Sequence, residues 1–343
     1  MLNSPWIRVR CLAVLAAMLP ILSCADGIQA QAASAQGGVE GPVAPAALAA
    51  SGASLLEQIR DAPFVVNYRG TRRVRLNYLR SDSVDYIEEV AADGLGQFSI
   101  EPMEVLGANP NADLVLALKS AHRVFDYRYR DFRVLDPALF DANYEWVLSE
   151  EQTSVVGRSC HHLIVPRLAP FQGGHYEADV DVETSLVLQW KEIDPAGTVL
   201  AHVAFDSIAF GADLSDVDLT SGLLTATELD ISGDFSHDVS FQVLTPSLLP
   251  TGYQLASATV LELASEENSS DPNDVWLRQL FTDGLQRAWL LHGPQVQSNG
   301  EDMIYVYSDG AWTIAMGKFD GNQVFAVGHV SEDQLLDMLR SLQ

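Results

Sequence analysis

Two segments near the end of the chain share one pattern: FTDGLQRAWL at residues 281–290 and YSDGAWTIAM at residues 307–316. In each segment an alternating apolar run precedes Thr/Ser-Asp-Gly, and another alternating run follows. Asp-Gly between such runs favours a β-hairpin, because Gly accepts the positive φ of a tight turn and Asp can hydrogen-bond its own backbone. The doubling therefore predicts two hairpins of one small antiparallel sheet. A strand at 323–330 and a terminal helix, which begins at the capping-box pattern 331–334, complete this unit.

The chain before these hairpins is dominated by short segments in which apolar and polar residues alternate. This period of two is typical of strands with one buried face, and turn residues such as Asp93-Gly94, Gly173-Gly174 and 194–197 stand between the segments. We expect strands at 84–90, 96–102, 122–129, 144–150, 161–167, 175–183, 186–194 and 199–210. Short helices are expected at 108–121 and 136–142.

Order is expected to begin at residues 54–57, Ser-Leu-Leu-Glu, whose capping-box pattern predicts a short helix that stops before Pro63. From Phe64 the period changes to two, which predicts a strand pair bent near Gly70. The fold class is therefore α+β. A large N-terminal antiparallel sheet with short helices is followed by a smaller C-terminal antiparallel sheet with a terminal helix.

Changes in composition divide the chain into five parts. Small and nearly uncharged residues precede the first helix, and a stretch rich in Asp, Ser, Thr and Gly separates the two sheets. The predicted parts are a signal peptide at 1–32, a flexible leader at 33–53, an N-terminal domain at 54–212, an acidic linker at 213–240 and a C-terminal domain at 241–343.

The first 32 residues have two interpretations. Arg8 and Arg10 precede an apolar run at 11–25, and an Ala-x-Ala site ends at Ala32, which is typical of a secretory signal peptide. The same run contains Ile-Leu-Ser-Cys, which resembles a lipoprotein box with Cys24 as the acylated residue. Both interpretations place the mature protein outside the cytoplasm, in the periplasm, either free or lipid-anchored.

Negative charge is concentrated in the second half of the chain. The formal net charge is −26, and the residues after Arg167 include 27 acidic but only five basic side chains. This part of the chain should repel nucleic acids and anionic surfaces. We therefore expect no nucleic-acid partner, and any anionic ligand should bind the first half.

No pattern in the sequence indicates catalysis, a cofactor or a metal. His161 and His162 are adjacent on a predicted strand, so their side chains point to opposite faces and cannot share one ion without a bulge. The sequence has no Gly-x-Ser-x-Gly elbow and no phosphate-binding Gly-rich loop before a helix. The prediction is a protein without enzymatic activity, cofactor, or catalytic or metal-ligating residues.

Arginine and aromatic side chains alternate in the first half and have two interpretations. They line an apolar cavity with a positively charged rim that binds an anionic ligand, or they fill a core and neutralise the protein's own acidic groups. The candidate cavity residues are Phe64, Val66, Tyr68, Tyr78, Tyr127, Tyr129, Tyr144 and Trp146. The candidate anion-binding residues are Arg69, Arg72, Arg73 and Arg75.

Five motifs in collinear order resemble the RseB/MucB family. They are NYRGTRRVRLNYLR at 67–80, DANYEWVLSEEQTSVVGRSCHHLIVPR at 141–167, the segment 175–210, LLPTGYQL at 248–255 and LFTDGLQRAW at 280–289. The resemblance implies an N-terminal domain similar to LolA and LolB, whose sheet is a strongly curved, open half-barrel, and a smaller C-terminal sheet with a helix.

The resemblance also implies a function. Members of that family are periplasmic negative regulators in the envelope stress response. They bind the periplasmic segment of a transmembrane anti-sigma factor of the RseA/MucA type and shield it from proteolysis, and lipid or lipopolysaccharide releases it. No residues of the partner interface follow from the motifs. The alternative function is a carrier of lipid or acylated protein that sorts outer-membrane lipoproteins.

Overall fold

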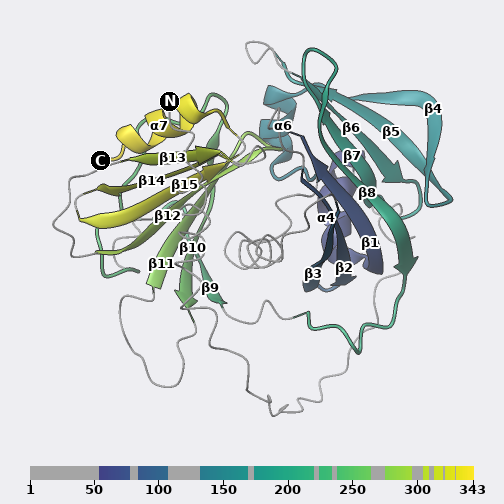
Figure 1. Ribbon diagram of the computed structural model, residues 1–343, viewed down its shortest axis with the longest axis horizontal. Coiled ribbons are helices and arrows are strands. Elements are labelled where there is room, and N and C mark those ends of the chain that lie inside the picture. The colour runs from purple at the N-terminus through teal and green to yellow at the C-terminus, as the bar shows by residue number, and fades with distance from the viewer. Residues whose placement is uncertain are drawn as a thin grey trace.

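The computed structural model describes residues 54–77, 84–106, 132–168, 174–219, 224–233, 238–263, 275–295, 304–308, 313–319, 321–328 and 330–343. These residues form two antiparallel sheets and three helices, which confirms the predicted α+β class (Figure 1). The signal peptide with Cys24, the leader, the helix at 108–121 and the strand at 122–129 lie outside the described residues. None of the described helices has the length and apolarity that a membrane-spanning helix needs.

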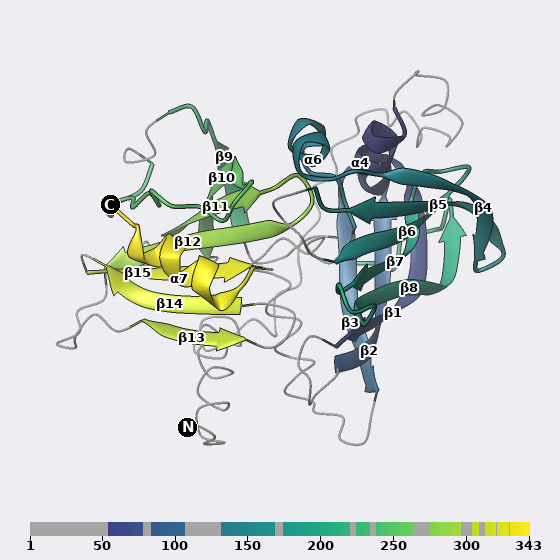
Figure 2. The same ribbon diagram turned by 90° about the horizontal axis from the view of Figure 1, so that it is seen from above.

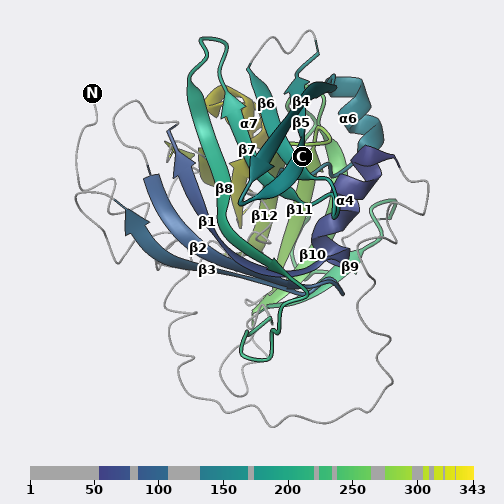
Figure 3. The ribbon, with the colours of Figure 1, turned by 90° about the vertical axis from the view of Figure 1, so that its right-hand side faces the viewer.

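The first sheet has eight strands in the order β3-β2-β1-β8-β7-β6-β5-β4. The strands are β1 (Asn67–Leu76), β2 (Val84–Asp93), β3 (Phe98–Leu106), β4 (Val147–Val155), β5 (Arg158–Pro166), β6 (His175–Asp181), β7 (Val187–Ile193) and β8 (Val199–Phe210). The sheet is strongly curved, with helices α4 (Leu55–Val65) and α6 (Pro137–Asn143) inside the curve (Figure 3). Apolar side chains of α4 pack against buried residues of β1, β2 and β8 there.

Helix α4 is longer than the sequence predicts. Its N-terminus has the expected capping box between Ser54 and Glu57, but the helix continues through Pro63 to Val65. A proline in the last turn removes only its own backbone hydrogen bond, and the amide of Val66 still donates to the carbonyl of Ala62. The expected stop before Pro63 is therefore wrong.

Strand β1 is one continuous strand and not a bent pair. It pairs with β2 in one register from Asn67–Asp93 to Leu76–Val84. The irregularity lies on the other side, where β8 carries one extra residue between the partners of Thr71 and Arg72. Gly70 allows the close approach of β8 at this point, because a Cβ atom here would lie 2.2 Å from the carbonyl oxygen of Ser207.

The second sheet has seven strands in the order β13-β14-β15-β12-β11-β10-β9. The strands are β9 (Leu224–Leu229), β10 (Gln254–Leu263), β11 (Val275–Thr282), β12 (Arg287–Gln295), β13 (Tyr305–Ser308), β14 (Thr313–Phe319) and β15 (Asn322–Gly328). Helix α7 (Glu332–Arg340) begins at the expected capping box and covers one face (Figure 2). Its buried Leu335, Met338 and Leu339 pack on that face.

Both predicted hairpins are confirmed by strand pairing. Thr282 pairs with Arg287 in the β11–β12 hairpin, and Ser308 pairs with Thr313 in the β13–β14 hairpin, whose turn at 309–312 lies outside the described residues.

The segment 213–240, expected to be a linker, is not one throughout. Its residues 224–229 form β9, which pairs with β10 as the edge strand of the second sheet. An edge strand takes its backbone hydrogen bonds from one neighbour, so it can form with few apolar residues. The polar composition of this segment concealed the strand.

Candidate functional site

Of the predicted cavity residues that the structure describes, Val66, Tyr68, Tyr144 and Trp146 belong to or pack against two core clusters, and Phe64 is half-buried outside them. Val66 and Tyr68 belong to the cluster under α4, where the ring of Tyr68 packs edge-on against Phe205 with centroids 6.1 Å apart. Tyr144 is buried in the second cluster, and Trp146 packs against it. Phe64 lies at the end of α4, with the guanidinium of Arg133 4.2 Å from its ring centroid. Tyr78, Tyr127 and Tyr129 lie outside the described residues.

The space left between these side chains is small. A cavity of about 20 Å³ is lined by Tyr68, Arg72, Phe132, Trp190 and Phe205, among others. This volume holds about one water molecule. Beside Arg72, the described side chains therefore leave room for little more than one water molecule.

The four candidate anion-binding arginines are each paired with a carboxylate of the chain. Arg69 Nε lies 2.5 Å from Glu89, and its Nη1 lies 2.9 Å from Asp216. Arg73 Nη2 lies 2.5 Å from Asp85, and the hydrogen bonds from Arg73 lower the pKa of that carboxyl. Arg75 lies 3.4 Å from the same Asp85. These pairings correspond to the second interpretation, in which the arginines neutralise the protein's own acidic groups.

Arg72 does not lie at a rim. Its side chain is 5% exposed and makes a 2.5 Å ion pair with Glu88, which is fully buried. Arg72 is buried because the regular pleat of β1 places every second residue on the inner face of the sheet. Arg72 therefore shares that face with Tyr68 and Val74.

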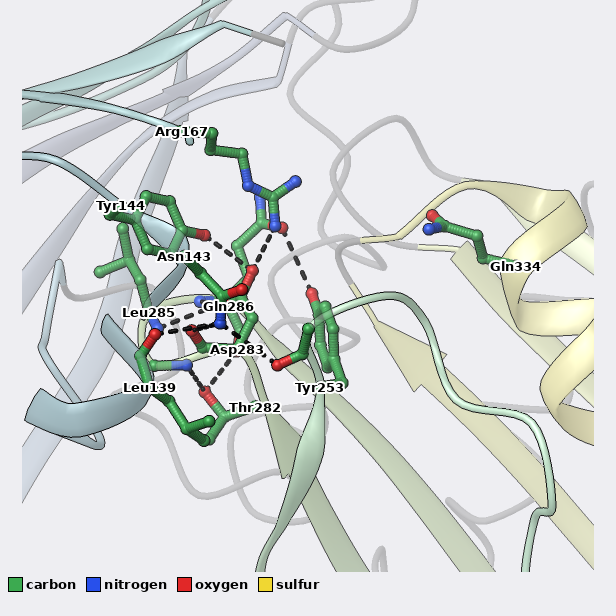
Figure 4. A network of polar contacts seen from close by, with 12 residues as sticks. Leu139, Asn143, Tyr144, Arg167, Tyr253, Thr282, Asp283, Leu285, Gln286 and Gln334 are labelled. Atoms are coloured by element: carbon green, nitrogen blue, oxygen red, sulfur yellow. Dashed lines mark hydrogen bonds and ion pairs between the residues drawn. The ribbon is translucent and has the colours of Figure 1, made fainter. Parts of the chain in front are cut away.

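An extensive polar network joins the two sheets at the β11–β12 turn (Figure 4). The turn is stabilised internally by side chains of the Thr-Asp-Gly motif. Asp283 Oδ1 accepts hydrogen bonds from the amides of Leu285 (3.1 Å) and Gln286 (2.7 Å). Thr282 Oγ1 accepts from the amide of Gly284 (3.0 Å) and donates to the carbonyl of Gln286 (2.7 Å). Gly284 has a φ of 103°, which favours glycine.

The carboxylate and backbone of this turn are bound by residues of the first domain. The Asp283 side chain is 1% exposed and forms an ion pair with Arg167. The Tyr144 hydroxyl donates a hydrogen bond to Asp283 Oδ2 at 2.8 Å. The side-chain amide of Asn143 donates to the Asp283 carbonyl at 2.9 Å. The amide of Leu135 donates to the Gly284 carbonyl at 2.8 Å.

Apolar contacts reinforce this joint. Leu285, at the tip of the turn, belongs to the core cluster of the first domain, together with Phe140 and Tyr176. Gln286 Nε2 lies 2.5 Å from the Tyr176 hydroxyl, and the Tyr253 hydroxyl donates to Gln286 Oε1 at 3.2 Å. The turn therefore completes the core of the other domain. We call residues 282–287, with Leu135, Asn143, Tyr144, Arg167, Tyr176 and Tyr253, the interdomain joint.

Burial controls the protonation of the tyrosines in the joint. It raises the pKa of Tyr144 and of Tyr253 well above the usual value of 10.0, and in both cases the charge of Asp283 adds to the effect. Both hydroxyl groups therefore remain protonated donors at neutral and moderately alkaline pH.

The sequence indicated the turn but not its role in the joint. Tyr144 was a candidate cavity residue, and the structure instead directs its hydroxyl at Asp283. Asn143, Arg167 and Gln286 were not predicted as functional residues.

The histidine pair behaves as the alternation of a strand requires. His162 Nδ1 lies 2.8 Å from Asp179 Oδ1, and Thr153 and Gln189 donate to the same carboxylate. His161 points to the other face. Within the described ranges, no group of three or more His, Cys, Asp or Glu side chains is placed to hold a metal ion.

Comparison with known proteins gave no matching family model and no matching curated protein. Among solved structures, the chain is similar to MucB in complex with MucA(peri), with 16% identity and a TM-score of 0.49 over 84% of this chain and 97% of that one. It is similar to MucB in the Pseudomonas aeruginosa MucA/MucB complex, with 18% identity and a TM-score of 0.48 over the same shares. A LolA superfamily protein from Nitrosomonas europaea has 10% identity and a TM-score of 0.19 over 52% of this chain and 98% of its own. MucB belongs to the family that the sequence motifs resemble.

Proposed function

We propose that this protein is a non-enzymatic periplasmic regulator that binds the periplasmic segment of a transmembrane anti-sigma factor and shields it from proteolysis. The observation that carries the proposal is the interdomain joint. It attaches one open antiparallel sheet to another through a turn whose Asp283 carboxylate is almost completely buried. The collinear sequence motifs supply the class of partner.

The joint suits a binding protein whose partner touches both domains. Interfaces between domains of one chain are often small and polar, so that relative motion is the default. Here the turn inserts Leu285 into the core of the first domain and is held there by Asn143, Tyr144 and Arg167. A partner that spans both sheets then meets a surface whose two halves are already placed, which lowers the entropic cost of binding.

Regulation by an anionic lipid is part of the proposal. Arg73 and Arg75 are 43% and 42% exposed, and they share the single carboxylate Asp85. Exposed ion pairs of this kind contribute little stability, so a phosphate group could replace Asp85 at small cost. If the lipid prefers the partner-free state, it weakens partner binding by linkage.

A carrier of lipid or acylated protein is the second candidate function, because the first sheet is curved around an apolar interior. It requires a larger cavity than the 20 Å³ beside Arg72. Native mass spectrometry of the gently purified protein distinguishes the two functions. A stoichiometric acyl chain supports the carrier, and a lipid-free protein that binds the anti-sigma segment supports the regulator.

The decisive experiment measures binding and protection together. The purified protein is titrated with the periplasmic segment of a MucA-type anti-sigma factor, and the same mixture is exposed to a protease that cleaves the free segment. We expect saturable binding and slower cleavage of the bound segment. A segment that does not bind, or that is cleaved equally fast with and without the protein, refutes the proposal.

A further inference from the structure

Strand β4 forms one edge of the first sheet and is exposed on both faces. It is the last strand in the order of the sheet and pairs with β5. Eight of its nine residues are exposed or half-exposed, so neither face is buried, and only Val155 at its end is buried. Figures 1 and 2 show β4 at the outer margin of the first sheet. The opposite edge strand, β3, carries Pro102, a residue that blocks strand addition.

The hydrogen-bonding groups along part of β4 point away from the sheet. Val156 and Gly157 form a two-residue turn, so the closing pair Val155–Arg158 is hydrogen-bonded and the next pair, Ser154–Ser159, is not. The Ser159 carbonyl indeed accepts from Val182 on the far side, at 3.1 Å. By the same alternation, the backbone groups of Gln152 and Ser154 face outward. Among the described residues the structure records no partner for them.

Exposed apolar side chains lie at both ends of this edge strand. Val147 and Leu148 at the start of β4 are 50% and 43% exposed, and Val156 in the turn after its last residue is 39% exposed. These side chains are available to a molecule that lies along the whole strand.

The turn itself is strained. Val156 has a φ of 46°, a left-handed conformation that costs a β-branched residue about 1–2 kcal/mol. Asn or Gly would relieve this strain, since they are the usual residues of such turns. Folding of the hairpin therefore does not explain the valine, whereas a contact made by its exposed side chain does.

We propose that β4 receives an extended segment of the partner protein as an additional strand of the sheet. The main chain of the segment hydrogen-bonds to Gln152 and Ser154, and its apolar side chains cover Val147, Leu148 and Val156. This mode of recognition obtains affinity from the backbone and specificity from alternate side chains. The inference rests on the proposed function, in which the partner is the periplasmic segment of an anti-sigma factor.

Charge selects the type of segment. Between Leu148 and Gln152 the pairing with β5 shifts, and the exposed Glu150 and Glu151 lie in this irregular stretch. Bulges and charges of one sign keep edges from pairing with copies of themselves. A second copy of this chain, with a net charge of −26, is therefore disfavoured. A segment that carries Lys or Arg near its apolar residues fits.

The test replaces one outward-facing amide. Gln152→Pro removes the amide hydrogen and places a ring on the edge without touching the β4–β5 hydrogen bonds, and Gln152→Ala is the matched control that keeps the amide. The ligand is the periplasmic segment of a MucA-type anti-sigma factor, measured by calorimetric titration. We expect Gln152→Pro to weaken binding about tenfold or more, and Gln152→Ala to bind within about twofold of the unmodified protein.

A second variant keeps the test valid if the proline disturbs folding, which circular dichroism detects. Glu150→Lys combined with Glu151→Lys leaves the backbone intact and should weaken binding about fivefold or more at low salt. Unchanged affinity in both variants overturns the edge-strand proposal and leaves the proposed function standing. If the unmodified protein does not bind the segment at all, the proposed function fails and this inference fails with it.

Discussion

Replacement of Gly284 by Ala tests whether the β11–β12 turn joins the two domains. Gly284 has a φ of +103°, and a Cβ atom at this position would lie 2.3 Å from the backbone nitrogen and 2.6 Å from the Cα of Phe140. Gly96 provides a matched control. Its φ is +102°, and a Cβ atom there would have no atom within 4 Å. The two substitutions therefore share the conformational cost and differ only in the contact across the joint.

The shared cost of a positive φ for alanine is about 1–2 kcal/mol. Gly284→Ala has an additional cost, because α6 and the turn must separate by about 1 Å to reach ordinary contact distance. That movement weakens the hydrogen bonds from Leu135 to Gly284 and from Asn143 to Asp283, at 2.8 Å and 2.9 Å. Each contributes about 1 kcal/mol, and partial loss of Leu285 packing adds a similar amount. We expect an excess of about 2–4 kcal/mol over Gly96→Ala.

Differential scanning calorimetry of the whole protein measures this difference. We expect the unmodified protein and Gly96→Ala to unfold in one transition, because the joint couples the domains. Gly284→Ala should show two separate transitions, because the coupling energy is largely lost. Equal destabilisation by the two substitutions, with the same shape of transition, would refute the claim that this turn is a joint.

Buried ionisable groups lead to three further expectations. Arg72→Met removes the ion pair of the buried Glu88 carboxylate and should lower the free energy of unfolding by about 3–5 kcal/mol, measured by chemical denaturation. The double variant with Glu88→Leu should recover most of this loss. An Arg72→Met protein as stable as the unmodified protein would contradict the expectation. Burial lowers the pKa of His292 from 6.5 to about 4. Between these two values the unfolded chain binds a proton that the folded chain does not. The free energy of unfolding should therefore fall by about 2 kcal/mol when the pH is lowered from 7 to 5. His292→Gln should remove this part of the slope, and an unchanged slope would argue against it. Burial raises the pKa of the Cys160 thiol to about 11. Alkylation of this thiol at pH 8 should therefore be slow in the native protein and fast in denaturant. Rapid alkylation of the native protein would contradict this expectation.

Local sequence patterns were sufficient for the elements of the fold. Asp283-Gly284 predicted a hairpin and the pattern at Ser54 and Ser331 predicted capped helices, because turns and caps are formed by residues within four positions of one another. The alternating run at 199–210 predicted β8 to the residue. Where a short-range pattern was incomplete, the prediction failed, as for the end of α4 beyond Pro63 and for the polar edge strand β9.

The roles of these elements depend on contacts between distant parts of the chain. Tyr144 and Asp283 are 139 positions apart, and nothing near either residue indicates that they form a hydrogen bond. Arg72 and its neighbours looked alike in the sequence, but the pleat and curvature of the first sheet buried one beside Glu88 and left Arg73 exposed. The sequence alone thus determined most of the turns, capped helix starts and alternating strands, since these depend on residues close together in the chain. Only the tertiary structure decided that the tip of one hairpin completes the core around the other sheet and that β4 is the edge strand of the described first sheet, because burial and strand order arise when the whole chain packs.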